Sequence, residues 1–140
     1  MNLNAETAAI LTGRFGKDSL IALATLDDNS PAVRAVDAYY DDCAFYAVTD
    51  ARSGKIQQIT KNPKVAICGD WFTAHGTAES LGQFLLPENA TMAEKLRTVF
   101  AAWLFDGDID INDENTIILR IKLNDGVLFN HGTRYEIDFT

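Results

Sequence analysis

Two basic side chains stand at the start of a short helix, where a helix normally disfavours positive charge. The segment at residues 55–61, which follows a strand-like run ending at Val48, has a helical pattern with Ser53 as its expected N-cap. Arg52 and Lys55 therefore fall at or inside the first turn, where the helix dipole disfavours a cation by roughly 0.3–1 kcal/mol. A bound anion would reverse this penalty, because the first N–H groups of a helix have no acceptor within the helix. The pattern predicts a phosphate site, and a solvated helix face is the alternative.

A third cation, Arg34, lies in a strand-like segment at residues 32–40. Period-two alternation places Arg34 on the same face as Ala32 and Val36, and that face is apolar. A guanidinium there needs a carboxylate or phosphate partner, because an unpaired buried charge is strongly unfavourable. The alternative is an arginine that snorkels at the rim of a barrel. With a partner, Arg34 would share one phosphate with the hydroxyl groups and the lysine of the helix start.

Other candidate residues carry less specific signals. Trp71 and Phe72 precede or open a strand, and they either line a ring pocket or pack in the core or in a dimer contact. His75 on a strand and His131 near a bend are either proton donors to a substrate or structural residues. No nucleophile or third metal ligand lies at a suggestive spacing from them. The sequence therefore assigns no catalytic acid or base and no metal site.

The composition narrows the choice of partners. The 140 residues carry a net charge of −8 at pH 7, which disfavours nucleic acid and anionic membranes as partners. Residues 51–64 nevertheless contain four basic residues and no acid. Cys43 and Cys68 show no CxxC spacing, so we expect buried, reduced thiols rather than a disulfide framework or a zinc site. Without a leader pattern or a run of roughly 18 apolar residues, a soluble, cytoplasmic protein is expected.

The helical pattern occurs three times. Asn4 is the expected N-cap of the first helix, which ends near Gly16. The second helix is the short one at residues 55–61, which Pro63 ends. The third, at residues 89–103, is the longest and has four apolar residues at helical spacing.

Strand-like runs outnumber the helices. The run at residues 20–26 is too apolar for a half-exposed strand, so we expect both of its faces to be covered. The last two runs surround an expected turn at residues 124–126, and the final run bends at Gly132. Short connections and little alternation with helices predict one mainly β (α+β) domain over residues 1–140, an antiparallel barrel with peripheral helices. The seven expected strands cover residues 20–26, 32–40, 43–48, 64–69, 72–80, 116–123 and 127–139.

Five short motifs follow one another between residues 20 and 79. They are Pro31-Ala32-Val33-Arg34-Ala35-Val36, Phe45-Tyr46 with Thr49, Ser53-Gly54-Lys55, Asn62-Pro63-Lys64-Val65-Ala66 and His75-Gly76-Thr77-Ala78. In this order they resemble the pyridoxamine 5′-phosphate oxidase-like family of FMN-binding split barrels, and the rest of the chain agrees by element order. The resemblance implies a homodimer with two FMN sites at the subunit interface and a small-molecule substrate over the flavin at the dimer cleft.

The resemblance also implies roles for individual residues. In the family, an arginine of the second strand, a threonine at the end of the third strand, and a serine and a lysine at the helix start hold the FMN phosphate and ribityl chain. It places the backbone around Val36 and Asp37, and the side of Val48, near the flavin ring. The expected cofactor-binding residues are Arg34, Val36, Asp37, Val48, Thr49, Arg52, Ser53, Lys55 and Trp71.

Two departures limit what the resemblance carries over. Oxidases of the family often have Ser-Arg-Lys where this chain has Ser53-Gly54-Lys55, so Arg52 is either a displaced phosphate ligand or a solvated side chain. A C-terminal extension that helps pyridoxamine-phosphate oxidases bind substrate looks missing, so oxidation of that substrate is not carried over. The leading hypothesis is an FMN-dependent oxidoreductase with an unknown substrate and a nicotinamide donor. The alternative is a non-catalytic flavin-binding or flavin-sensing dimer, or a scaffold without cofactor.

Overall fold

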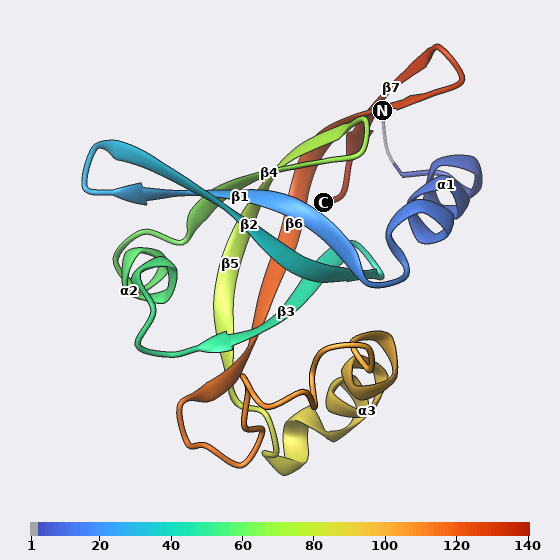
Figure 1. Cartoon of the computed structure of the whole chain (residues 1–140). Coiled ribbons are helices and arrows are strands. Elements are labelled where there is room, and N and C mark those ends of the chain that lie inside the picture. Colours follow the sequence, from blue (N-terminus) through green and yellow to red (C-terminus); the bar gives the residue numbers. More distant parts are fainter. Residues whose placement is uncertain (1–2) are drawn as a thin grey trace.

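Seven strands surround most of the buried residues in the computed structural model, which describes residues 3–140 (Figure 1). The strands are β1 (Ser19–Asp27), β2 (Ser30–Asp41), β3 (Ala44–Asp50), β4 (Lys64–Gly69), β5 (Phe72–Gln83), β6 (Thr116–Asn130) and β7 (Thr133–Asp138). The helices are α1 (Ala5–Phe15), α2 (Gly54–Lys61), the short 3-10 helix η1 (Pro87–Asn89) and α3 (Ala90–Val99). No helix within residues 3–140 has the length and apolar character needed to cross a membrane.

All seven strands belong to one antiparallel sheet that closes on itself. Their order is β3-β2-β1-β4-β5-β6-β7, and a further pairing of β3 with β6 closes β1 to β6 into a barrel. The hairpin of β6 and β7 extends beyond one end of the barrel (Figure 1). The sequence prediction of a mainly β, antiparallel split barrel with peripheral helices is confirmed.

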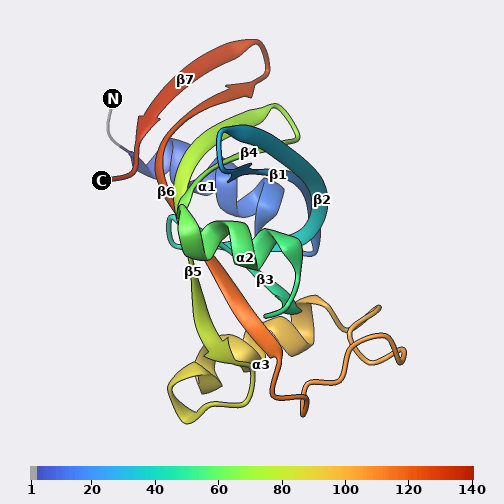
Figure 2. The same ribbon diagram turned by 90° about the vertical axis from the view of Figure 1, so that its left-hand side faces the viewer.

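The barrel is split where β2 and β3 diverge. Residues 39–41 of β2 pair with residues 44–46 of β3, whereas all of β3 pairs with β6. Residues 30–38 of β2 therefore have β1 on one edge and, within the described chain, no strand on the other. The helix α2 lies across this opening, between the diverging ends of β2 and β3 (Figure 2).

Two apolar clusters hold the helices against the sheet. The first fills the barrel around Phe45 and Phe72 and includes Leu11 of α1 and Ile56 of α2. The second packs α3 against β3 and β6 around Leu96. The clusters fix α2 at one side of the split and α3 at the other.

One face of β1 is exposed, so the prediction that both faces are covered is wrong for the single chain. Side chains alternate along β1 between buried and more exposed positions, as the period of a strand requires. The inward face packs in the barrel, whereas Leu20 on the outward face is 67% exposed and Val33 of β2 is 70% exposed. We call the following outward, apolar positions of β1, β2 and β4 the outer sheet face: Leu20, Ala22, Ala24, Val33, Ala35 and Ala66.

The expected turn at residues 124–126 is also wrong, because β6 continues through it. Asn124 is the extra residue of a bulge, since His75 pairs with Asp125 and Gly76 pairs with Leu123. The chain turns at His131 and Gly132 instead, with φ angles of 50° and 79°. Positive φ at two adjacent residues is typical of a tight hairpin turn.

Two smaller predictions need correction. The helix α3 ends at Val99 rather than at Trp103, because the following residues form turns in which the Trp103 N–H donates to the Phe100 carbonyl at 3.1 Å. The free thiol of Cys43 is half-buried and that of Cys68 is exposed, so the expected burial of both thiols is wrong. Cys68 lies on the outward side of β4, which the single chain leaves uncovered.

Candidate functional site

The guanidinium group of Arg34 points into the split barrel, and its hydrogen-bond acceptors among residues 3–140 are all uncharged. Its guanidinium donates to the Thr25 hydroxyl at 2.7 Å, to the Leu23 carbonyl at 3.2 Å and to the Gln58 side-chain oxygen at 3.1 Å. The Thr25 hydroxyl donates to the same Gln58 oxygen at 2.5 Å. Dipoles therefore fix the half-buried guanidinium, and its positive charge remains for a ligand.

Lys55 lies near Arg34 in the first turn of α2. Partial burial and the nearby Arg34 guanidinium lower the pKa of Lys55, and Asp50 has a smaller opposite effect. Neither cation forms an ion pair with a carboxylate of residues 3–140. Like charges brought together without a carboxylate are an arrangement that a bound anion stabilises.

The hydroxyl of Ser53 lacks a partner at the same helix end. Ser53 is the N-cap of α2, but its buried Oγ forms no hydrogen bond with the described residues. Asn4, in contrast, caps α1 by accepting from the Thr7 N–H at 2.9 Å. An unsatisfied buried hydroxyl costs about 1–3 kcal/mol. An anion that accepts from this hydroxyl and from the first N–H groups of α2 would remove that cost.

Arg52 pairs with a neighbouring acid instead of joining the two cations. Its Nε and terminal nitrogen donate to the two Asp50 carboxylate oxygens at 3.0 and 2.8 Å. These hydrogen bonds lower the pKa of Asp50 to about 2. Both side chains are exposed. The structure thus brings Arg34, Lys55 and Ser53 together and holds Arg52 on Asp50.

The remaining expected cofactor residues border the split from β2 and β3. Thr49 is half-buried near the end of β3, and the buried Val48 packs among the residues that hold α3. Val36 is half-buried on the inward side of β2. Asp37 points outward, where burial and then the nearby Asp18 raise the pKa of its carboxyl group.

Thr25 and Gln58, which position Arg34, were missed in the sequence. Both had a signal. Thr25 is the one hydroxyl residue in the apolar run at residues 20–26, and it falls at an inward position. Gln58 follows Lys55 by three residues, which places both side chains on one face of the helix.

Trp71 and His131 lie in turns at the other end of the molecule. Trp71 joins β4 to β5 at the end of β4 opposite Lys64, with a φ angle of 54° and 72% exposure. Its ring meets that of Phe129 edge to face, with a centroid distance of 6.3 Å. The exposed His131 occupies the turn between β6 and β7. Neither residue joins Arg34 and Lys55 within one chain.

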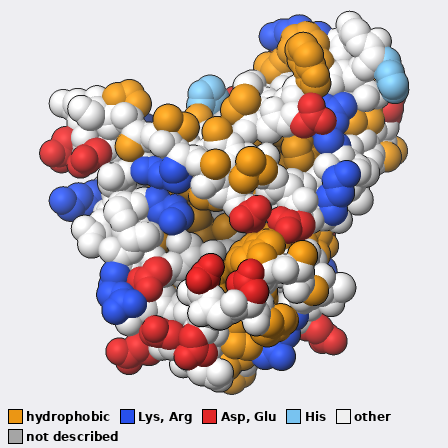
Figure 3. Space-filling model, viewed as in Figure 1, with side chains coloured by type: hydrophobic (Ala, Val, Ile, Leu, Met, Phe, Trp, Pro, Cys, Tyr) orange, Lys and Arg blue, Asp and Glu red, His pale blue; other side chains and the backbone are white. Residues whose placement is uncertain are grey.

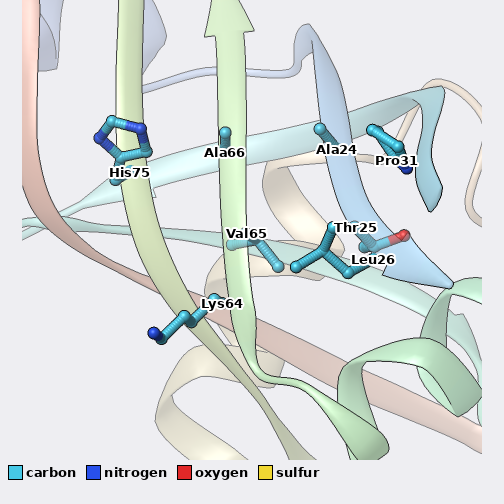
Figure 4. Close-up of a pocket in the computed structure, with 8 residues that line it drawn as sticks. All are labelled: Ala24, Thr25, Leu26, Pro31, Lys64, Val65, Ala66 and His75. Atoms are coloured by element: carbon cyan, nitrogen blue, oxygen red, sulfur yellow. The ribbon is translucent and has the colours of Figure 1, made fainter. Parts of the chain in front are cut away.

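His75 faces outward from β5 and belongs to a different surface. Its Nδ1 lies 2.8 Å from an Asp125 carboxylate oxygen. The ring borders a groove of about 220 Å³ on the outer sheet face, where Ala66 and Ala24 separate it from Pro31 (Figure 4). In the described part of the chain, no cluster of three or more His, Cys, Asp or Glu side chains could hold a metal ion.

The donors at the split suit a phosphate monoester. Such a group carries a charge of about −1.5 to −2 near neutral pH and has three strong acceptor oxygens. Arg34 and Lys55 match this charge, and the Ser53 hydroxyl and the first N–H groups of α2 match the acceptors. The phosphate of FMN, which the sequence resemblance implies, fits the chemistry of this donor set.

Solved structures share this fold across most of the chain. A FAD-binding protein from Mesorhizobium loti is 19% identical, with a TM-score of 0.68, and the match covers 89% of this chain and 92% of that protein. A NimC/NimA family protein from Clostridium acetobutylicum is 20% identical, with a TM-score of 0.68, and the match covers 94% of this chain and 89% of that protein. General Stress Protein 26 from Bacillus anthracis is 17% identical, with a TM-score of 0.68, and the match covers 90% of this chain and 95% of that protein. At these identities the likeness shows the fold alone.

Sequence comparison identifies the family. Among curated proteins, no sequence matches the chain. The pattern of the family described as pyridoxamine 5′-phosphate oxidase matches residues 5–124. This range contains β1 to β5, α2, α3 and most of β6 up to its bulge, so it includes the split and every residue that surrounds it. The chain therefore belongs to the pyridoxamine 5′-phosphate oxidase family.

Proposed function

We propose that the protein binds FMN at the split and acts as an FMN-dependent oxidoreductase on a small molecule. The observation that carries the proposal is the pair of cations, Arg34 and Lys55, which lie near each other beside the unsatisfied Ser53 hydroxyl and form no ion pair with a carboxylate of residues 3–140. A phosphate group satisfies all three at once. Thr49 adds a second hydroxyl from the end of β3.

FMN is favoured over other flavins by the charge of its terminal phosphate. A phosphate monoester carries nearly two charges on one phosphorus, whereas each phosphate of a dinucleotide such as FAD has one ester and one anhydride bond and carries one charge. Two basic side chains and a helix N-terminus match the dianion best. Riboflavin, which has no phosphate, would leave Arg34 and Lys55 without their anion.

The flavin supplies the redox chemistry when it is bound, and the chain positions it. Arg34, Lys55 and Ser53 hold the phosphate end at α2. The unpaired edge of β2 around Val36 and Asp37 then borders the ring, with Val48 on the side of β3. Arg52 is a more distant cation that would approach the phosphate only if it left Asp50.

A second copy of the chain would complete the site. The outer sheet face carries small or exposed apolar side chains on three adjacent strands, and a homodimer would bury them. Trp71 lies at the far end of β4, so its contact with a flavin would require the FMN site of the second copy. The substrate, and a nicotinamide donor, would then approach the ring at the dimer cleft.

The visible spectrum of the purified full-length protein tests the proposal. We expect flavin absorbance after purification or after incubation with FMN, and bleaching of that absorbance when NADPH or another donor is added. A protein that remains colourless after incubation with FMN contradicts FMN binding. A protein that binds FMN but is not reduced by any donor is a flavin-binding dimer without oxidoreductase activity.

A further inference from the structure

A second cavity lies between β2 and α3. It has a volume of about 430 Å³ and is lined by Tyr39, Thr91, Glu94, Lys95, Thr98 and Val99. Sites for small molecules range from about 300 to 1,000 Å³, so the cavity has room for one ring system with its substituents. None of its lining residues belongs to the donor set that we assign to the phosphate.

The charges of this cavity do not suit an anion. Lys95 is its one cation, and the Asp41 carboxylate accepts from Lys95 Nζ at 2.8 Å. This hydrogen bond and the charge of Asp41 raise the pKa of Lys95, and the phenols of Tyr39 and Tyr46 act in the same direction. Glu94 adds a carboxylate without an ion-pair partner among residues 3–140.

The cavity lies along β2 from the phosphate-binding end of the split. Tyr39 follows Arg34 by five residues, a distance of about 17 Å at roughly 3.3 Å per residue, and this odd spacing places the two side chains on opposite faces of β2. Asp37, two residues before Tyr39 on the same outward face of β2, adds a carboxylate close to Asp18. Figure 3 shows Lys and Arg side chains on the α2 side of the hollow and along the right-hand edge of the molecule, with several Asp and Glu side chains beside and below the hollow. Asp37 and Glu94 thus place carboxylates near the cavity, whereas Arg34 points to the other face of β2.

An anionic substrate would face two obstacles in this cavity. It would have to displace Asp41 from Lys95 to obtain a positive partner, and it would then lie beside Glu94. A cationic or uncharged ring has neither problem, since Glu94 offers a carboxylate and Tyr39 offers an aromatic surface.

We propose that the cavity between β2 and α3 is the substrate subsite of the flavin centre and that it selects a cationic or uncharged ring compound, such as an aromatic amine, over its phosphorylated or carboxylated analogue. This inference rests on the proposed function, because it places the subsite beside the ring end of the FMN site. Glu94 and the Asp41–Lys95 pair determine the selectivity.

A matched pair of probes tests the selectivity. Pyridoxamine carries a cationic amine, and pyridoxamine 5′-phosphate adds only the phosphate group. The full-length protein is saturated with FMN, so that neither probe competes for the first site, and each probe is titrated by calorimetry. We expect pyridoxamine to bind at least about tenfold more tightly than its phosphate ester. Equal affinity, or tighter binding of the ester, overturns the inference.

Three variants test whether the preference for pyridoxamine arises in the cavity between β2 and α3. Glu94→Lys should reverse the preference, whereas Glu88→Lys, the same charge change on η1 outside the cavity lining, should leave it unchanged. Thr98→Trp should fill the cavity and abolish binding of pyridoxamine. Each variant is first shown to retain the flavin spectrum, which demonstrates folding. Equal effects of the two lysine variants, or normal pyridoxamine binding by Thr98→Trp, contradict the location.

The two proposals fail in different ways. If the native protein does not bind FMN, the proposed function fails before any probe is added. If it binds FMN but prefers the phosphate ester, the selectivity alone is wrong and the FMN site stands.

Discussion

Arg34 and Lys55 show how a binding site can be recognised from charges that lack partners. Each residue could be predicted separately, Arg34 from its apolar strand face and Lys55 from the helix start. The sequence predicted that they would share one phosphate, and in the structure Arg34 lies near Lys55 because β2 and α2 pack across the split. Thr25 escaped prediction because a single polar residue in an apolar run does not show which charge it contacts, and Gln58 because it is one of several polar residues of α2.

Lys55→Met should affect stability and binding in opposite directions. Because the pKa of Lys55 is lowered in the fold, its charge is unfavourable in the FMN-free protein, and the neutral variant should melt at the same or a higher temperature. FMN binding should weaken by about 2–4 kcal/mol through loss of a charge-assisted contact. Thermal melts and FMN titrations of the variant measure both effects.

The pH dependence provides a control for this prediction. A cation whose pKa is lowered on folding destabilises the fold while it is charged, so stability should rise with pH from the lowered pKa of Lys55 up to about 10.5. Lys55→Met should reduce this rise, whereas Lys61→Met, at an exposed position of the same helix, should not. Identical profiles for the two variants would contradict the assignment.

At the scale of elements, the sequence predicts most strands and helices, but it predicts a turn at Gly126 where the strand β6 continues. The expected turn at residues 124–126 relied on Gly126. In the structure a Cβ at Gly126 would lie 2.9 Å from the Phe72 ring and from the Thr73 carbonyl oxygen, so glycine permits close packing of two strands there. The true turn, at His131 and Gly132, lies where the sequence predicted a bend in the final run.

Two glycine-to-alanine substitutions distinguish the effect of side-chain packing on stability from the effect of the conformational entropy of the unfolded chain. Gly126→Ala should lower the free energy of unfolding by about 1–3 kcal/mol, because the added methyl group meets a ring and a carbonyl. Gly13→Ala, inside α1 with no atom within 4 Å of its Cβ, should raise it by about 0.5–1 kcal/mol. Chemical denaturation measures both, and an unchanged stability of Gly126→Ala would contradict the close packing of the two strands at Gly126.

The two helix N-caps should respond differently to alanine. Asn4→Ala removes a satisfied cap of α1 and should cost about 1 kcal/mol of stability. Ser53→Ala removes an unsatisfied hydroxyl, so the FMN-free protein should lose little or no stability while its FMN affinity falls. Denaturation and FMN titration distinguish the two roles. A loss of stability at Ser53 equal to that at Asn4 would identify Ser53 as an ordinary cap.

For the whole molecule, composition and strand pattern predicted the barrel, but they did not predict that one side is left uncovered. A strand as apolar as β1 was expected to be covered on both faces, and the single chain covers only its inward face. The acidic net charge is also unevenly distributed, with basic residues around α2 and acids around Asp37 and Glu94. The basic segment at residues 51–64 could be read from the sequence, whereas the positions of Asp37 and Glu94 relative to it depend on the closure of the barrel.

A charge on the outer sheet face should prevent dimerisation. Ala66→Glu places a carboxylate between β1 and β5 at the centre of this face, where a second copy would bury it without a partner. Light scattering should give a dimer for the native protein and a monomer for the variant. Thr133→Glu, at an exposed hairpin position, is the control and should remain dimeric. A monomeric native protein at micromolar concentration would exclude the proposed dimer.

The comparison of FMN with riboflavin tests the phosphate site most directly, because the two ligands differ only in the phosphate group. Both are titrated into the flavin-free, full-length protein, and binding is followed by quenching of flavin fluorescence. We expect FMN to bind at least about 30-fold more tightly, equivalent to about 2 kcal/mol, and Arg34→Ala to remove most of this difference. Equal affinity of the native protein for FMN and riboflavin would contradict the assignment of Arg34, Lys55 and Ser53 to a phosphate group.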